Sequence, residues 1–73
     1  MPLVLAPKGE NLQIVRVAGN QKVSHHLENL GITSGAVITL LSQDNGNMIV
    51  RVHDSRLALD RDVAKLIIVR PAA

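Results

Sequence analysis

The stretch Leu30-Gly31-Ile32-Thr33-Ser34-Gly35-Ala36-Val37-Ile38-Thr39-Leu40 predicts a helix end, a tight connection and the start of a strand. Gly31 stands where a helix commonly closes with a left-handed residue, a conformation that glycine adopts at little cost. Ser34 and Gly35 predict a second turn. After this turn the side chains alternate, so Ile38 and Leu40 share one face of the predicted strand. A short helix that leads into a strand through two glycines defines a particular architecture.

Upstream of this stretch, the chain predicts a turn, a strand and one helix. Pro7-Lys8-Gly9-Glu10 is typical of a turn, and residues 12–17 follow as a strand that needs a bulge to accommodate its apolar run. Residues 21–30 are the helical candidate. Its apolar stripe consists of Val23, Leu27 and Leu30, and either Asn20 or Ser24 can serve as the N-cap.

Downstream, the chain predicts four strands and one helical turn. The strand at residues 36–42 is followed by Asn45-Gly46, the strongest short hairpin signal, and by a strand at residues 48–53. Asp54-Ser55 predicts a reversal without glycine. The remaining elements are a strand at residues 56–59, a helical turn at residues 60–64 and a last strand at residues 66–70 that Pro71 ends. Five strands, one short helix and one helical turn predict a mainly β fold, a small barrel formed by residues 1–73 as one domain.

Composition restricts the function. The chain of 73 residues contains no Cys, Phe, Tyr or Trp. The core must therefore be aliphatic, and thiolate metal sites and iron–sulfur clusters are excluded. Grooves that bind proline-rich peptides and surfaces that stack nucleotide bases both use aromatic side chains, so neither is available in its usual form.

Charge and hydropathy indicate a solvated surface. Residues 1–50 carry equal numbers of basic and acidic side chains, and residues 51–73 carry the whole net charge of +2, interleaved with acids. This pattern does not favour nucleic acid as a partner. Residues 1–6 are apolar but too short for a signal peptide, and no run is long enough to span a membrane. We therefore expect a cytoplasmic protein without membrane insertion.

The ordered set of these features resembles the FeoA family, small cytosolic proteins of bacterial ferrous iron uptake. The resemblance extends over nearly the whole chain and rests on Pro7-Lys8-Gly9-Glu10, Leu27, Leu30-Gly31-Ile32, Ser34-Gly35-Ala36, Ile38, Leu40, Leu57-Ala58-Leu59, Ala64, Ile67 and Val69. The fold that it implies is an SH3-like barrel. Two positions depart from the family pattern: Asp54-Ser55 replaces a usual glycine turn, and Asp60 stands where a basic residue is common.

The resemblance also implies a function. FeoA proteins are accessory or regulatory partners of FeoB, a membrane permease with a cytosolic GTP-binding domain. The same barrel is appended to metal-dependent repressors of the DtxR type as a regulatory module. We therefore expect contact with the cytosolic part of a FeoB-like transporter. Two alternatives are a metal-linked regulatory module and a small nucleic-acid-binding barrel, and weak self-association is left open.

The sequence favours neither catalysis nor a tight metal site. Ser24-His25 and His53-Asp54 are the nearest approaches to a catalytic pair, but sequence neighbours rarely face each other on a helix or a strand. His25 and His26 splay about 100° apart on a helix. His25 with Glu28 or Asn29 would give two ligands at most, enough only for weak or adventitious binding of a transition metal. We expect no catalytic residue, no cofactor and no metal ligand.

Two surfaces are candidates for partner binding. One is the solvent side of the helix, with His25, His26, Glu28 and Asn29, and the other is the outer face of the third strand, with Ile49, Arg51 and His53. The structural turn residues are Gly31, Gly35, Asn45 and Gly46. The apolar residues on the alternate strand face, Val37, Leu41 and Ile49, are either covered by other segments or form an exposed docking patch.

Overall fold

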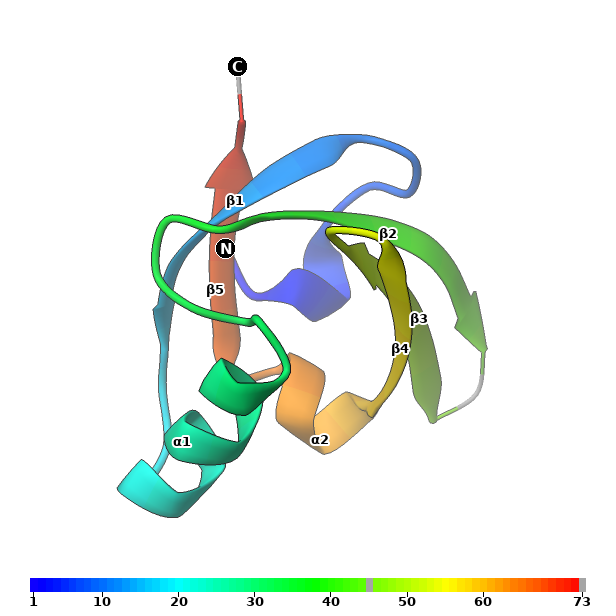
Figure 1. The fold of residues 1–73 in the computed structure, drawn as a ribbon. Helices are drawn as coiled ribbons and strands as arrows, with labels where there is room; N and C mark the ends of the chain where they lie inside the picture. The colour runs from blue at the N-terminus through cyan, green and yellow to red at the C-terminus, as the bar shows by residue number, and fades with distance from the viewer. Residues whose placement is uncertain (45, 73) are drawn as a thin grey trace.

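The computed structural model describes residues 1–44 and 46–72, and its main feature is one strongly bent antiparallel sheet (Figure 1). The strand order is β4-β3-β2-β1-β5. The strands are β1 (Asn11–Val17), β2 (Val37–Asp44), β3 (Asn47–Val52), β4 (Ser55–Asp60) and β5 (Ile67–Pro71). The helical segments are a 3-10 helix η1 (Leu3–Leu5), α1 (Gln21–Asn29) and α2 (Arg61–Ala64).

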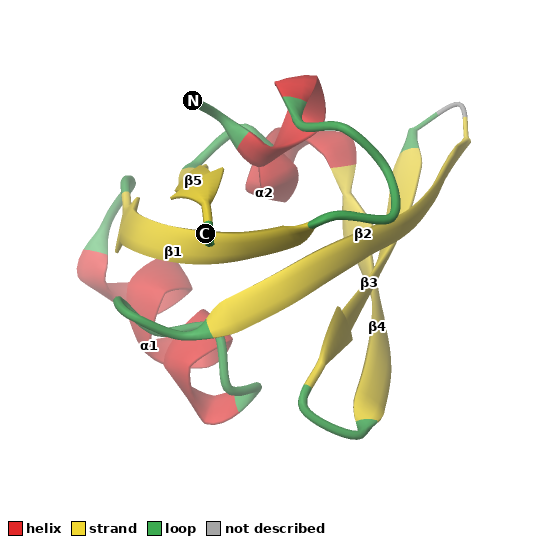
Figure 2. Cartoon of the chain, turned by 90° about the horizontal axis from the view of Figure 1, so that it is seen from above, coloured by secondary structure: helices red, strands yellow, loops and turns green. Residues whose placement is uncertain are grey.

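All five predicted strands and both predicted helical segments are present, with ends displaced by one or two residues. Pro71 is the last residue of β5 and pairs with Leu12, so it lies in the strand that it was expected to end. Seen from above, η1 and α2 lie next to each other, and the β3–β4 hairpin lies across the sheet from β5 and both chain ends (Figure 2).

The core is aliphatic, as the composition predicts. Alternate side chains of the strands point inward and meet Leu27 of α1 and Ile32 after it. The largest fully buried side chains are Leu3, Leu12, Ile14, Leu27, Ile32, Ile38, Leu40, Met48, Val50, Val52, Ile67 and Val69. Val, Ile and Leu suit a small bent sheet because their compact, stiff side chains pack well on a pleated surface.

The N-terminal segment contributes to the fold in a way that the sequence does not indicate. Leu3 in η1 is completely buried, and Pro2 forms a β-bridge with Ile68. The Met1 carbonyl accepts a hydrogen bond from the Val69 backbone N–H at 2.7 Å, and the Met1 amino group donates to the Val69 carbonyl at 2.8 Å. These contacts cover part of the outer edge of β5. A 3-10 segment of three residues has no hydrophobic periodicity, so only the tertiary contacts reveal it.

The bulge predicted in the first strand is confirmed. The pairing of β1 with β5 shifts register between Ile14 and Arg16, which leaves Val15 as the extra residue. Ile14 is buried and Val15 is exposed. The bulge therefore lets an apolar run keep its larger members inside without breaking the strand.

Helix α1 begins and ends as the sequence predicts. Asn20 is its N-cap, and the Asn20 Oδ1 accepts a hydrogen bond from the Val23 backbone N–H at 2.9 Å. At the other end Gly31 has φ 91°, its N–H donates to the Glu28 carbonyl, and the Ile32 N–H donates to the Leu27 carbonyl. This pair of bonds is the Schellman motif, in which a left-handed residue satisfies the last helical carbonyls.

The predicted apolar stripe of α1 is wrong at its last position. Leu27 is buried and Val23 packs against the core, but Leu30 is 37% exposed. Leu30 is the C-cap, where the backbone leaves helical geometry, so its side chain no longer follows the helical period.

The turn between β3 and β4 lies one residue earlier than the sequence predicts. Val52 pairs with Ser55, so the two-residue loop is His53-Asp54 and not Asp54-Ser55. His53 has φ 55°, which places it in the left-handed region. His53 is therefore a turn residue, and its expected position on the outer face of a strand is wrong. The error arises because no glycine marks the turn.

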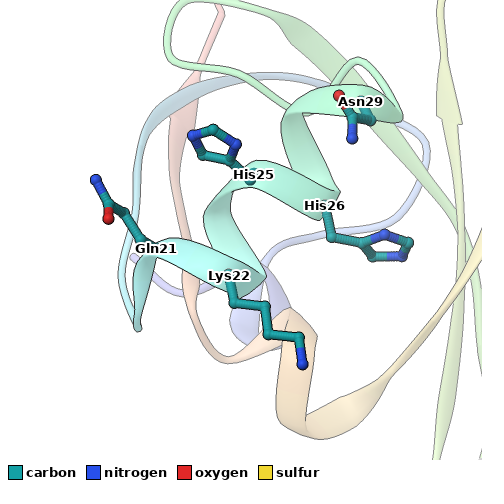
Figure 3. Close-up of a pocket in the computed structure, with 5 residues that line it drawn as sticks. All are labelled: Gln21, Lys22, His25, His26 and Asn29. Carbon is teal, nitrogen blue, oxygen red and sulfur yellow. The ribbon is translucent and has the colours of Figure 1, made fainter.

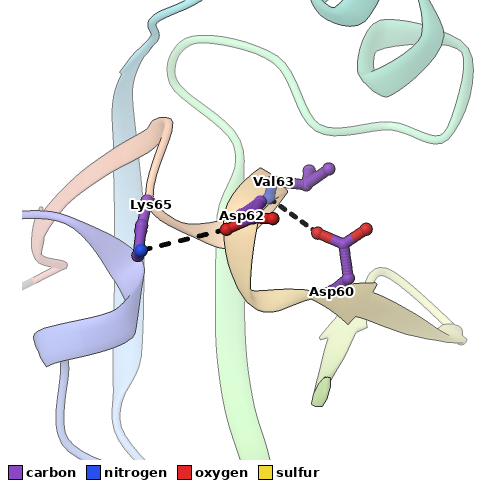
Figure 4. Close-up of polar contacts among 4 residues, drawn as sticks. All are labelled: Asp60, Asp62, Val63 and Lys65. Carbon is purple, nitrogen blue, oxygen red and sulfur yellow. Dashed lines mark hydrogen bonds and ion pairs between the residues drawn. The ribbon is translucent and has the colours of Figure 1, made fainter. Parts of the chain in front are cut away.

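The start of α2 explains an unusual residue. The Asp60 carboxylate accepts a hydrogen bond from the Val63 backbone N–H at 2.9 Å, which makes Asp60 the N-cap (Figure 4). A basic residue could not accept this bond. In the next turn Lys65 Nζ lies 3.8 Å from Asp62 Oδ1, an exposed pair that adds little to stability.

Candidate partner-binding surface

The predicted helix surface is present on α1. His25, His26, Glu28 and Asn29 are all exposed. A shallow hollow over the helix is lined by Gln21, Lys22, His25, His26 and Asn29 (Figure 3). Glu28 does not line this hollow. The two imidazoles point to different sides of the helix, so they present two separate polar groups to a partner.

A second hollow beside α1 is apolar. It lies where α1 faces α2, and its lining consists of Lys22, Val23, His26, Leu27 and Val63. His26 therefore borders both hollows on this helix. Val63 escaped the sequence analysis because its side chain comes from α2, some 40 positions away in the chain.

The predicted strand surface divides into two parts. Arg51 and His53 line one open hollow together with residues of β1, β2 and the connection before β2, namely Asn11, Gly35, Ala36, Val37 and Thr39. Ile49 lies elsewhere, because it pairs with Ser42 of β2 and Ala58 of β4. The structure therefore groups Arg51 with His53 and separates Ile49 from them.

The alternatives for the apolar strand face are resolved between the two extremes. Val37 is 47% exposed, whereas Leu41 and Ile49 are partly buried. Val37 lies among polar neighbours in the hollow with Arg51 and His53. The three apolar residues are therefore neither fully covered nor fully exposed.

A polar network links three strands on the outer face of the sheet. Arg70 of β5 donates to the Gln13 Oε1 through Nε at 3.0 Å and through a terminal nitrogen at 2.7 Å. The Gln13 amide donates in turn to the Gly35 carbonyl at 3.3 Å. These bonds hold the Arg70 side chain against the sheet. Sequence reasoning missed the network because Gln13 and Arg70 are 57 positions apart.

The predicted turn glycines are confirmed where the structure describes them. Gly35 has φ 89° and Gly46 has φ 93°. The Ser34 hydroxyl beside Gly35 donates to the Val15 carbonyl at 2.9 Å, which ties this turn to β1. Asn45 lies outside the described residues.

The described part of the chain shows no grouping typical of an enzyme or a metal centre. Within residues 1–44 and 46–72, no three His, Asp or Glu side chains come together as possible metal ligands. Over the same residues, no hydrogen bond joins the side chains of Ser24 and His25 or those of His53 and Asp54. None of the helices described is both long enough and apolar enough to cross a membrane.

The sequence matches the model of the FeoA domain over residues 1–71. No curated protein matches the chain. Among solved structures, one described as an iron uptake regulatory protein (FeoA) is 27% identical, with a TM-score of 0.88, and the match covers 96% of this chain and 95% of that one. The FeoA protein from Chlorobium tepidum is 25% identical, with a TM-score of 0.90, and the match covers all of this chain and 71% of that one.

A structural likeness extends to a larger protein. ScaR with bound Zn²⁺ is 23% identical, with a TM-score of 0.88, and the match covers 97% of this chain but 36% of that one. This likeness confirms the SH3-like fold that the strand pattern and the family resemblance predicted. With the domain match over residues 1–71 and the close agreement with FeoA structures, the chain belongs to the FeoA family.

Proposed function

We propose that this protein is a non-enzymatic accessory subunit of bacterial ferrous iron uptake that binds the cytosolic part of a FeoB-type membrane transporter. The observation that carries the proposal is the FeoA domain match over residues 1–71. A relative of nearly the same length is described as an iron uptake regulatory protein, which supports a regulatory role.

The surface features support action through macromolecular contact. The hollows on α1 and beside Arg51 are shallow and open, and polar side chains that carry no internal salt bridge border them. A molecule whose extents are 29 × 28 × 23 Å can offer only a modest interface. We therefore expect a transient complex with a dissociation constant on the order of micromolar.

Uptake of iron by a deletion strain tests the biological role. The strain should import radiolabelled ferrous iron slowly and import ferric chelates at the normal rate. Expression of the protein from a plasmid should restore ferrous uptake. Unimpaired ferrous uptake in the deletion strain would contradict the proposed function and leave the fold and the family unaffected.

A contact variant tests the surface. Arg51→Glu combined with His26→Ala should weaken binding to the purified cytosolic domain of the transporter about tenfold, because both side chains are exposed in the two hollows. Lys8→Glu in the turn before β1 is the matched control and should leave binding unchanged. Circular dichroism checks that both variants stay folded.

The second candidate function is a metal-linked regulatory module. The specific observation in its favour is the likeness of the fold to ScaR with bound Zn²⁺. Two ligands from one helix, such as His25 with Glu28, make only a weak site, so we expect no submicromolar binding of ferrous iron or zinc. Calorimetry separates the candidates: tight binding that His25→Ala abolishes would favour the metal-linked module.

A further inference from the structure

Strand β4 is an open edge of the sheet. It pairs with β3 on one side and is the last strand in the order β4-β3-β2-β1-β5. The opposite edge strand, β5, is partly covered by Met1 and Pro2. Within the described residues, no hydrogen bond supplies β4 with a partner on its outer side. The two edges of the sheet are therefore managed differently.

The hairpin register shows which backbone groups face outward. A two-residue loop closes on a hydrogen-bonded pair, here Val52 and Ser55, and the bonding alternates from there along the hairpin. Leu57 and Leu59 consequently bond to β3. Arg56 and Ala58 direct their backbone N–H and C=O groups away from β3, toward the open edge.

The same register places two arginines side by side. Arg51 of β3 lies directly opposite Arg56 of β4, in a non-hydrogen-bonded pair where Cα atoms approach to about 4.5 Å. Both side chains are exposed. Within the described residues the only ion pair joins Lys65 to Asp62, so neither arginine has a carboxylate partner. Like charges in direct opposition destabilise a sheet, and this pair therefore needs a reason other than stability.

We propose that β4 receives an extended acidic segment of a partner protein as a sixth strand. A carboxylate of that segment lies over Arg56 and Arg51, and its backbone bonds to the outward groups of Arg56 and Ala58. An aliphatic side chain two positions from the carboxylate covers Ala58 and the partly buried Ile49 behind it. One ligand thus satisfies both the open edge and the unpaired arginines.

Protection against aggregation and pairing with a second copy both account for the arginines less well. A charge on an edge strand discourages aggregation, but that role needs Arg56 alone and does not require Arg51 opposite it. A second copy of this chain paired along β4 would bring four arginines onto one outer face with no carboxylate between them. The acidic strand is also independent of the proposed function, because any protein could supply it.

The test uses a defined peptide, acetyl-Thr-Glu-Thr-Val-Thr-Glu-Thr-amide, whose sequence is the same in both directions and so fits a parallel or an antiparallel strand. The control peptide has lysine in place of both glutamates. In NMR titrations of the full chain, the acidic peptide should shift the amides of Arg56 and Ala58 and slow their hydrogen exchange severalfold, and the lysine peptide should not.

Charge variants make the test more specific. Arg56→Glu should raise the melting temperature by about 2–5 °C, because Glu pairs with Arg51, while it abolishes binding of the acidic peptide. Arg16→Glu, an exposed position on β1, is the matched control and should leave the peptide affinity within twofold. A gain in stability together with a loss of binding cannot come from unfolding.

A backbone variant tests the edge itself. Ala58→Pro removes an N–H that faces away from β3, a position where an edge strand tolerates proline. It should keep the native circular dichroism and lower the peptide affinity at least tenfold. Ala58→Val retains the N–H and should preserve binding.

Several results would overturn the proposal. Equal binding of the lysine peptide, shifts confined to α1 or β5, or unchanged binding by Arg56→Glu would each do so. Tight, salt-dependent binding of duplex DNA that Arg56→Glu abolishes would assign the arginines to nucleic acid instead. Concentration-dependent shifts at β4 without peptide would assign the edge to a second copy of the chain.

Discussion

Two neighbouring reversals of this chain have the same backbone handedness but different residues. The end of α1 has Gly31 at φ 91°, and the turn between β3 and β4 has His53 at φ 55°. The two reversals lie against each other. A Cβ atom at Gly31 would lie 3.2 Å from Cγ1 of Val52 and 3.6 Å from Cδ2 of His53.

Handedness alone therefore does not select glycine. Gly31 satisfies two requirements, a left-handed backbone and a space with no room for a side chain. His53 satisfies only the first, and its own ring helps to fill the space beside Gly31. Histidine is among the residues that tolerate the left-handed region, so the absence of glycine from this family turn costs little.

Gly31→Val should have the largest effect at the two reversals. A β-branched residue is strained at this φ, and its side chain would collide with the buried Val52, so we expect a loss of roughly 2–4 kcal/mol in the free energy of unfolding. Urea denaturation measures the change. A variant within about 0.5 kcal/mol of the parent would show that the helix end is not fixed in this way.

Gly31→Ala compared with Gly9→Ala should separate the two requirements at Gly31. Gly9 has φ 81° and nothing within 4 Å of its Cβ position, so Gly9→Ala reports the backbone strain alone. The loss at Gly31 should exceed that at Gly9 by about 0.5–1 kcal/mol, because a buried neighbour must move. Equal losses would remove the steric part of the argument. Thermal denaturation of both variants in one buffer provides the measurement.

His53→Val and His53→Gly should produce the smallest changes. Valine at positive φ should lower the free energy of unfolding by about 1 kcal/mol. Glycine relieves the backbone strain but increases the entropy of the unfolded chain, so its net effect on urea denaturation should stay within about 0.5 kcal/mol. If glycine destabilised the protein as much as valine, packing of the His53 ring would outweigh backbone strain at this turn.

Features that depend on local chemistry were predictable from the sequence. Asn20 and Gly31 marked the ends of α1, and the apolar run at Ile14 predicted the bulge in β1. The turn at His53-Asp54 was misplaced by one residue because Asp and Ser also favour turns and no glycine indicated the position. The 3-10 helix at Leu3–Leu5 has too few residues to show a period.

The candidate surface was predictable only in part. Exposure of His25, His26 and Asn29 followed from the helical period, and the structure gathers them around one hollow. The separation of Ile49 from Arg51 and His53 depends on the cross-strand register. Contacts such as that of Arg70 with Gln13 join opposite ends of the chain, and no local pattern predicts them.

The covered edge of β5 limits how this sheet can grow. A sheet with two open edges can add copies of itself without limit, and fibres form in this way. Here Met1 and Pro2 occupy part of one edge, and β4 is the other. Strand addition at β4 therefore ends with one neighbour, so the protein can have a binding edge without becoming the unit of a polymer.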